Sequence, residues 1–171
     1  NISITFHAQN RLAKAKTIDA LALDVVFFGV NQELSTDTKL KQQNIFISKL
    51  NYFSDLSLMG HWLEAEALWK EIASMERDWI RKAYRPGSAE YKHARFLFWQ
   101  GKLDEESLAL AEKLARDGKN RTTIRFLHYL RGQWHREQGQ WALAANSFQE
   151  AVQMIRAVGR RDEAAEAFLA L

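Results

Sequence analysis

The chain has 171 residues, of which 47% are hydrophobic and 26% charged, and its formal net charge is +3. This composition is typical of a globular protein and excludes a disordered polyelectrolyte. The absence of cysteine excludes disulfides, thiolate zinc sites and cysteine nucleophiles; it is compatible with a reducing compartment, and we expect a cytoplasmic protein.

The distribution of helix breakers predicts an all-α chain. Pro86 is the single proline, and eight glycines leave long stretches rich in Ala, Leu, Glu, Lys, Gln and Arg. We expect Ser35 or Asp37 to cap the third helix and Ser88 to cap the helix that follows the break at Pro86. The predicted helices span residues 5–15, 17–32, 38–58, 61–82, 88–100, 104–117, 121–138, 141–157 and 161–171.

The most apolar stretch of the chain indicates whether it crosses a membrane, and its two ends indicate whether it is part of a longer polypeptide. Residues 20–30 are interrupted by Asp24 and are fewer than the roughly 20 residues that cross a bilayer, so we expect no membrane span. The chain begins at Asn1 without a signal-peptide pattern and stops at Leu171 within an alanine-rich helical run. These ends predict a domain cut from a longer polypeptide, with residues 161–171 as the first helix of a truncated repeat.

Three glycines mark an internal repeat. Each of Gly60, Gly101 and Gly139 is followed two residues later by a large apolar residue and then by a helical run. The intervals between them are 41 and 38 residues, which leaves room for two helices of about five turns each. Such a glycine can cap a helix in the left-handed region, while a small residue before it lets two helices approach. Seven residues before the glycine, the three units have Phe53, Ala94 and Gly132. Five residues after it they have Ala65, Glu106 and Ala144, and nine residues after it they have Trp69, Leu110 and Phe148.

These columns resemble the tetratricopeptide repeat (TPR), whose pattern has a small residue, glycine, an aromatic residue, alanine, a second aromatic residue and alanine. The last unit matches best, through Gly132, Gly139, Trp141, Ala144, Phe148 and Ala151. Units of nearly forty residues resemble the longer variant found in sensor regions of large bacterial LuxR-type transcription activators and in peptide-responsive regulators. Phe53 and Glu106 depart from the pattern, because they stand where a small residue and an alanine belong.

The resemblance covers residues 41–171 and leaves residues 1–40 as N-terminal helices outside the repeats. It implies one helical-repeat domain over residues 1–171, folded as a right-handed superhelical array of antiparallel helix hairpins, a TPR-like α-solenoid. Trp62, Trp69 and Trp141 stand in the repeat columns, so we expect them to pack within the hairpins.

The sequence offers little for catalysis. It contains neither a glycine-rich phosphate loop nor the G-x-S-x-G and H-E-x-x-H motifs. His128 and His135 are two helical turns, or about 10 Å, apart, which is too far for one zinc ion. We interpret the histidines as surface or groove residues and Glu105 and Glu106 as solvated helix carboxylates. We expect no enzymatic activity, no metal and no cofactor.

The resemblance also implies where a partner docks, because the first helix of each repeat lines the concave face. For three of the aromatic residues predicted to line this face, Phe98, Trp99 and Phe126, the alternative is that they merely pack against adjacent helices and do not contact a partner. Aromatic residues with interspersed arginine are typical of binding hot spots. The residues predicted to line this face are Tyr91, Arg95, Phe98 and Trp99 in the middle repeat and Phe126, Tyr129, Gln133 and Arg136 in the last.

A local excess of positive charge runs from Lys113 to Arg136. This run contains seven basic residues and a single acidic residue, Asp117. A solvated helix surface is the interpretation we favour, and an acidic peptide or protein partner or a nucleic acid are the alternatives.

The leading functional hypothesis is a protein- or effector-binding module of a larger bacterial regulatory protein, in particular a transcriptional one. Its partner would be a protein, a peptide or a small effector molecule held on the concave face. A structural scaffold that assembles with itself through a repeat edge is the alternative from a different class. Nucleic-acid binding by the repeat is the third hypothesis.

Overall fold

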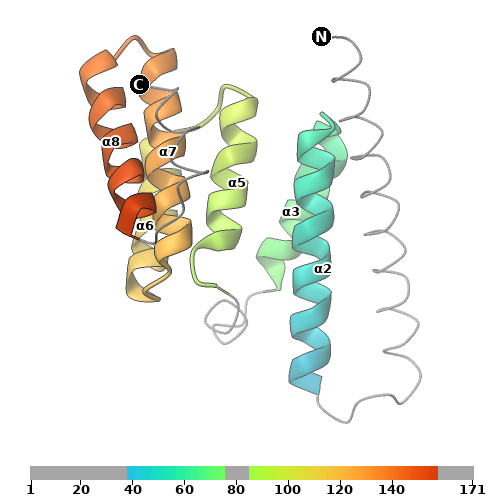
Figure 1. The fold of residues 1–171 in the computed structure, drawn as a ribbon. Coiled ribbons are helices and arrows are strands. Elements are labelled where there is room, and N and C mark those ends of the chain that lie inside the picture. Colours follow the sequence, from blue (N-terminus) through green and yellow to red (C-terminus); the bar gives the residue numbers. More distant parts are fainter. Residues whose placement is uncertain (1–37, 76–84, 158–171) are drawn as a thin grey trace, which may run out of the picture. The chain divides into compact units, whose positions relative to one another are not determined.

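The computed structural model describes residues 38–75 and 85–157, which form six helices and no strand (Figure 1). The all-α prediction is therefore confirmed for these ranges. The chain divides into two compact units, Asn1–Tyr84 and Arg85–Leu171, beside the expected break at Pro86. The helices predicted over 5–15, 17–32 and 161–171, and the candidate caps Ser35 and Asp37, lie outside the described residues.

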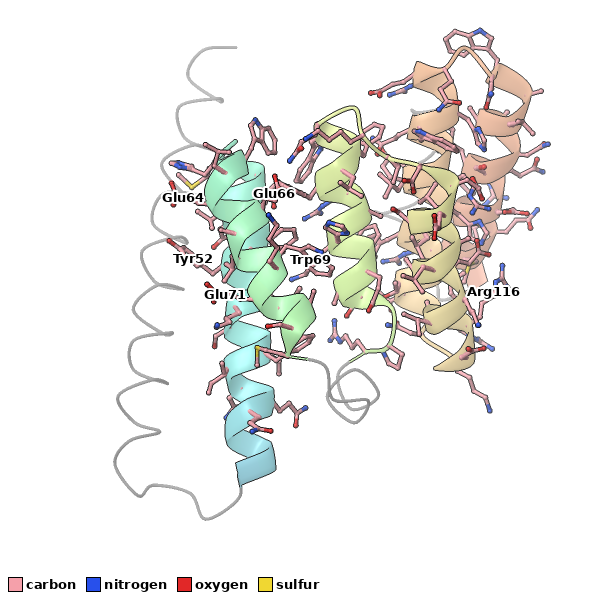
Figure 2. The ribbon with its side chains drawn as sticks, turned by 180° about the vertical axis from the view of Figure 1, so that it is seen from behind. Tyr52, Glu64, Glu66, Trp69, Glu71 and Arg116 are labelled. Carbon is pink, nitrogen blue, oxygen red and sulfur yellow. The ribbon has the colours of Figure 1, made fainter. Side chains whose placement is uncertain are left out.

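The first unit contains a hairpin of α2 (Thr38–Leu58) and α3 (Trp62–Ser74). Figure 2 labels side chains on both helices, among them Trp69 on α3. The Trp69 ring lies 5.5 Å from the ring of Phe53, so its predicted packing role is confirmed. The buried residues of the hairpin recur every three or four positions along α2, as an amphipathic helix requires. They include Phe46, Leu50, Phe53 and Leu56 of α2 with Ala65 and Ile72 of α3.

The prediction of one uninterrupted helix over residues 61–82 was wrong at Met75, and residues 76–82 lie outside the described part of the chain. α3 ends at Ser74, and the N–H of Met75 bonds to the carbonyls of Glu71 and Ile72, both at 3.2 Å. The Ser74 hydroxyl also donates to the Glu71 carbonyl at 2.8 Å. Neither glycine nor proline marks this end, so helix propensity alone did not predict the end of α3 at Ser74.

The second unit contains α5 (Ser88–Trp99), α6 (Glu105–Asp117), α7 (Arg121–Glu137) and α8 (Trp141–Ala157). α7 is its central helix, because it packs against α5, α6 and α8. Figure 1 shows α5 and α7 side by side. The main core of this unit consists of Ala94, Leu103, Leu108, Ala111, Ala115, Ile124, Leu127 and Leu130.

Gly60, Gly101 and Gly139 form the corners of three helix hairpins, as predicted. Their φ angles are 77°, 67° and 72°, in the left-handed region. Glycine adopts this conformation readily, whereas it is energetically unfavourable for a residue that has a Cβ atom. At each corner the glycine N–H bonds to the carbonyl three residues back, and the following N–H bonds to the carbonyl five residues before it. This pair of bonds is the Schellman motif, which satisfies carbonyls left free at a helix end.

The corner at Gly101 is two residues longer than the other two. α3 and α8 begin two residues after their glycine, whereas α6 begins at Glu105. Asp104 delays the start because it is an extended N-cap whose carboxylate accepts the Ser107 N–H at 2.8 Å. Every repeat column in α6 therefore falls two residues later than the glycine spacing indicates.

The predicted columns in α6 were consequently wrong. Glu106 and Leu110 are exposed. Leu108 takes the buried position of Ala65 and Ala144, three residues into each helix. Glu112 stands where the other hairpins place Trp69 and Phe148. A carboxylate thus replaces a large aromatic ring in the middle hairpin.

Three further local predictions were wrong. Ser88 is the first residue of α5, and the N-cap is Gly87, with φ 79°. Trp62 and Trp141 are exposed, Trp141 at 67%. Each begins a helix, and helical side chains lean toward the N-terminus, so these indoles extend past the core.

Gly132 lets α7 and α8 pack closely. A Cβ on Gly132 would lie 2.6 Å from Cδ1 of Phe148, which is buried. Only a glycine at this position lets the Phe148 ring lie this close to the α7 backbone.

Gly139→Ala should destabilise the chain by about 1 to 2 kcal/mol, because alanine must adopt the left-handed corner conformation. Gly139→Asn should cost less, since asparagine enters this region more readily. Urea unfolding followed by circular dichroism measures both, with Gln138→Ala as the neighbouring control. Unchanged stability of Gly139→Ala would contradict the corner assignment.

Candidate functional site

Tyr91, Arg95 and Trp99 lie on successive turns of α5, and the arginine contacts both aromatic rings. We call this row of three side chains the ladder. The guanidinium carbon of Arg95 lies 5.7 Å from the ring centroid of Tyr91 and 4.8 Å from that of Trp99. Their spacing of four residues places all three on one side of the helix. Both distances allow cation–π attraction, which orients the guanidinium group between the two rings.

The ladder continues onto α7 through Phe126. Its ring stacks on Tyr91, with the centroids 5.6 Å apart and the planes 17° from parallel. The Phe126 side chain is still 39% exposed. The guanidinium carbon of Arg125 lies 4.6 Å from the Phe126 ring centroid. We call Tyr91, Arg95, Trp99, Arg125 and Phe126 the aromatic–arginine face.

The Tyr91 phenol is neutral in this setting. Burial raises the pKa of Tyr91 above its usual value of 10.0, although the charge and hydrogen bond of Arg95 act in the opposite direction. The phenol therefore keeps its proton at physiological pH and presents no negative charge to a partner.

The other four predicted residues have different surroundings. Phe98 packs against the core of α5, α6 and α7, as Tyr91 also does. The packing role that we considered as the alternative is thus observed for Phe98 and, through its stacking on Tyr91 of α5, also for Phe126. Tyr129 packs against α8, with its ring 5.5 Å from that of Phe148. Gln133 is half-buried and Arg136 is exposed further along α7. Arg125 was missed because the repeat pattern selects Phe126, and a long arginine can reach over the ring of the next residue.

A second cluster joins α6 and α7 through the carboxylate of Glu112. Arg116 donates to it at 2.5 Å, and Arg131 lies 3.2 Å from it and 2.9 Å from Glu105. Partial burial raises the pKa of Glu112, but the hydrogen bond from Arg116 and the charges of both arginines lower it further, so the pKa lies below its usual value. Glu105 is thus an ion-pair partner of Arg131 and not only a solvated carboxylate.

His128 links the same region to α8. Its Nδ1 lies 2.7 Å from Oε2 of Glu150, and the residue is buried, at 9% exposure. Burial lowers the pKa of His128, although Glu150 and Glu112 favour the protonated form. The prediction of a surface or groove histidine was therefore wrong for His128. Within 38–75 and 85–157, the structure holds no group of three histidine, aspartate or glutamate residues placed to bind a metal.

The basic run from Lys113 to Arg136 is divided among different surroundings. Arg116 and Arg131 pair with carboxylates, whereas Arg125 is buried against Phe126. In Figure 2, Arg116 lies on the side of α6 away from α5. These three arginines therefore do not line up as one phosphate-binding strip.

Comparison of the chain with known protein families, with curated proteins and with solved structures finds no match. No helix in the part of the chain that the structure describes is long and apolar enough to cross a membrane.

The free energy of unfolding should decrease as the pH is lowered, because His128 is buried in the folded chain. Because folding lowers the pKa of His128, the unfolded chain takes up the proton first as the pH drops below about 6.5. The stability that neutral His128 contributes is present above that pH and is lost as the pH approaches the lower, folded pKa. His128→Gln keeps a donor for Glu150 and should flatten this part of the pH profile.

Urea unfolding between about pH 7.5 and 5.5 measures the effect. His135→Gln is the control, because His135 lies near the end of α7 with its Nδ1 2.6 Å from Gln140. An identical pH profile for His128→Gln and the unmodified chain would contradict this assignment.

Proposed function

We propose that this chain is the protein-binding helical-repeat module of a larger bacterial regulatory protein, in particular a transcriptional one, and that the aromatic–arginine face holds the partner. The observation that carries the proposal is the contact of Phe126 on α7 with Tyr91 on α5, which extends the Arg95 ladder across two helices. A face shared by the first helices of two hairpins is also what a TPR-like superhelix would offer.

The composition and order of this face support binding. Tryptophan, tyrosine and arginine dominate the free energy of protein interfaces. Here the rings and guanidinium groups already contact one another, so these side chains would lose less entropy when a partner binds. Phe126 remains exposed to provide contact area.

Self-assembly is the second candidate, and a specific observation favours it. Large apolar side chains are exposed beside two of the corners, with Leu63 at 85%, Trp141 at 67% and Leu143 at 49%. Exposed apolar residues that gather in a patch mark association surfaces. Light scattering separates the candidates, because a monomer over a wide concentration range excludes self-assembly through these corners.

Peptides selected from a displayed library against the whole chain provide the test of partner binding. Phe126→Ala and Trp99→Ala should each weaken a selected peptide by about tenfold or more, since hot-spot truncations cost upwards of 1 to 2 kcal/mol. Fluorescence anisotropy measures the affinity, and circular dichroism checks that helicity is kept.

Leu110→Ala is the matched control for these variants. Leu110 is a large apolar residue that is 52% exposed on α6, outside the aromatic–arginine face. Affinity that drops equally in the control, or that survives both face substitutions, would exclude this face as the binding site.

A further inference from the structure

Charge in the second unit is segregated by helix. α7 carries four arginines against Glu137, and α5 carries Lys92 and Arg95 against Glu90. In contrast, α6 carries four acidic residues against two basic ones, and α8 carries one of each. The two helices that share the aromatic–arginine face are therefore the basic ones, and the second helix of each hairpin is acidic or neutral.

The first unit repeats this asymmetry. α2, the first helix of its hairpin, carries three lysines against Asp55. α3, the second helix, carries three glutamates against Lys70. Because the same bias occurs in a separate hairpin, it follows the position of a helix in its hairpin and is not confined to one run of sequence.

The arginines of the second unit also differ in what holds them. Arg116 and Arg131 are ion-paired with Glu112, so the charge of each is compensated within the chain. Arg95 is instead positioned by the Tyr91 and Trp99 rings, and its Nε is a buried donor without a hydrogen-bond partner. Because aromatic rings and not a carboxylate hold Arg95 in place, its charge is available to a carboxylate of a bound partner.

We infer that the aromatic–arginine face binds an acidic polypeptide segment, whose carboxylates meet Arg95 while its apolar side chains contact Phe126. This inference rests on the proposed function and adds the chemistry of the partner. Charge complementarity supplies the argument, because a carboxylate is the planar acceptor that a guanidinium group binds through two parallel hydrogen bonds.

A nucleic acid fits the same face less well. Duplex binding draws on many phosphate contacts, and two of the arginines in the basic run are already bound to carboxylates. Stacking of bases needs free ring faces, whereas Tyr91 is covered by Phe126 on one side and by Arg95. An acidic peptide requires only the guanidinium groups and the exposed edge of Phe126.

The test uses the whole chain and four fluorescein-labelled probes. Three are short peptides of equal length with the same phenylalanine and tryptophan positions, whose other residues are glutamate, serine or lysine, and the fourth is a single-stranded oligonucleotide. Anisotropy at low and at physiological salt gives the affinities. The glutamate peptide should bind about tenfold more tightly than the serine peptide, and the preference should shrink as salt increases.

Charge-neutralising variants locate the effect. Arg95→Gln should weaken the glutamate peptide by about fivefold and leave the serine peptide unchanged. Lys113→Gln removes the same charge from an exposed position on α6 and should change neither affinity. Circular dichroism confirms that the variants keep their helicity.

Three results would overturn the inference. These are equal binding of the serine or lysine peptide, tighter binding of the oligonucleotide, and loss of affinity that is as large in Lys113→Gln as in Arg95→Gln. If Phe126→Ala still weakens a peptide of any charge, the proposed binding face stands and only the acidic preference fails. If Phe126→Ala affects no peptide, the proposed function fails with it.

Discussion

Reversal of the chain at a left-handed glycine is the constraint on which every hairpin of this structure depends. Gly60, Gly101 and Gly139 share one backbone conformation and one pair of capping hydrogen bonds, although the sequences around them differ. The caps satisfy the last carbonyls of one helix and turn the chain so that the next helix packs against it. Each corner thereby converts two amphipathic helices into a unit with one buried seam.

The position of α7 follows from these corners and explains why side chains of different chemistry gather on it. Its contacts with α5, α6 and α8 require that each side of the helix has a different chemistry. The side toward α8 has Gly132 for close packing, the side toward α6 has Arg131 for Glu112, and the side toward α5 has Phe126 for Tyr91.

Backbone features were predictable from the sequence, whereas side-chain networks were not. Glycine spacing and helix propensity predicted α2 and α8 with their observed ends, because capping and breaker signals are local. The end of α3 lacks such a signal. The N-cap Asp104 shifts the register of α6 by two residues. The glycine spacing therefore did not predict that Glu112 occupies the repeat position, nor that it pairs with Arg131. Burial of His128 depends on packing from α8, which spacing along α7 cannot reveal.

The contact between α5 and α7 is the central claim, and the absence of cysteine permits a direct measurement of it. The double variant Tyr91→Cys with Phe126→Cys places two thiols where the stacked rings now lie. A short bis-maleimide should cross-link them within one molecule rapidly, and a control pair made from Leu110→Cys and Phe126→Cys should react far more slowly. Equal rates for the two pairs, read by mass spectrometry after proteolysis, would contradict a face shared by the two helices.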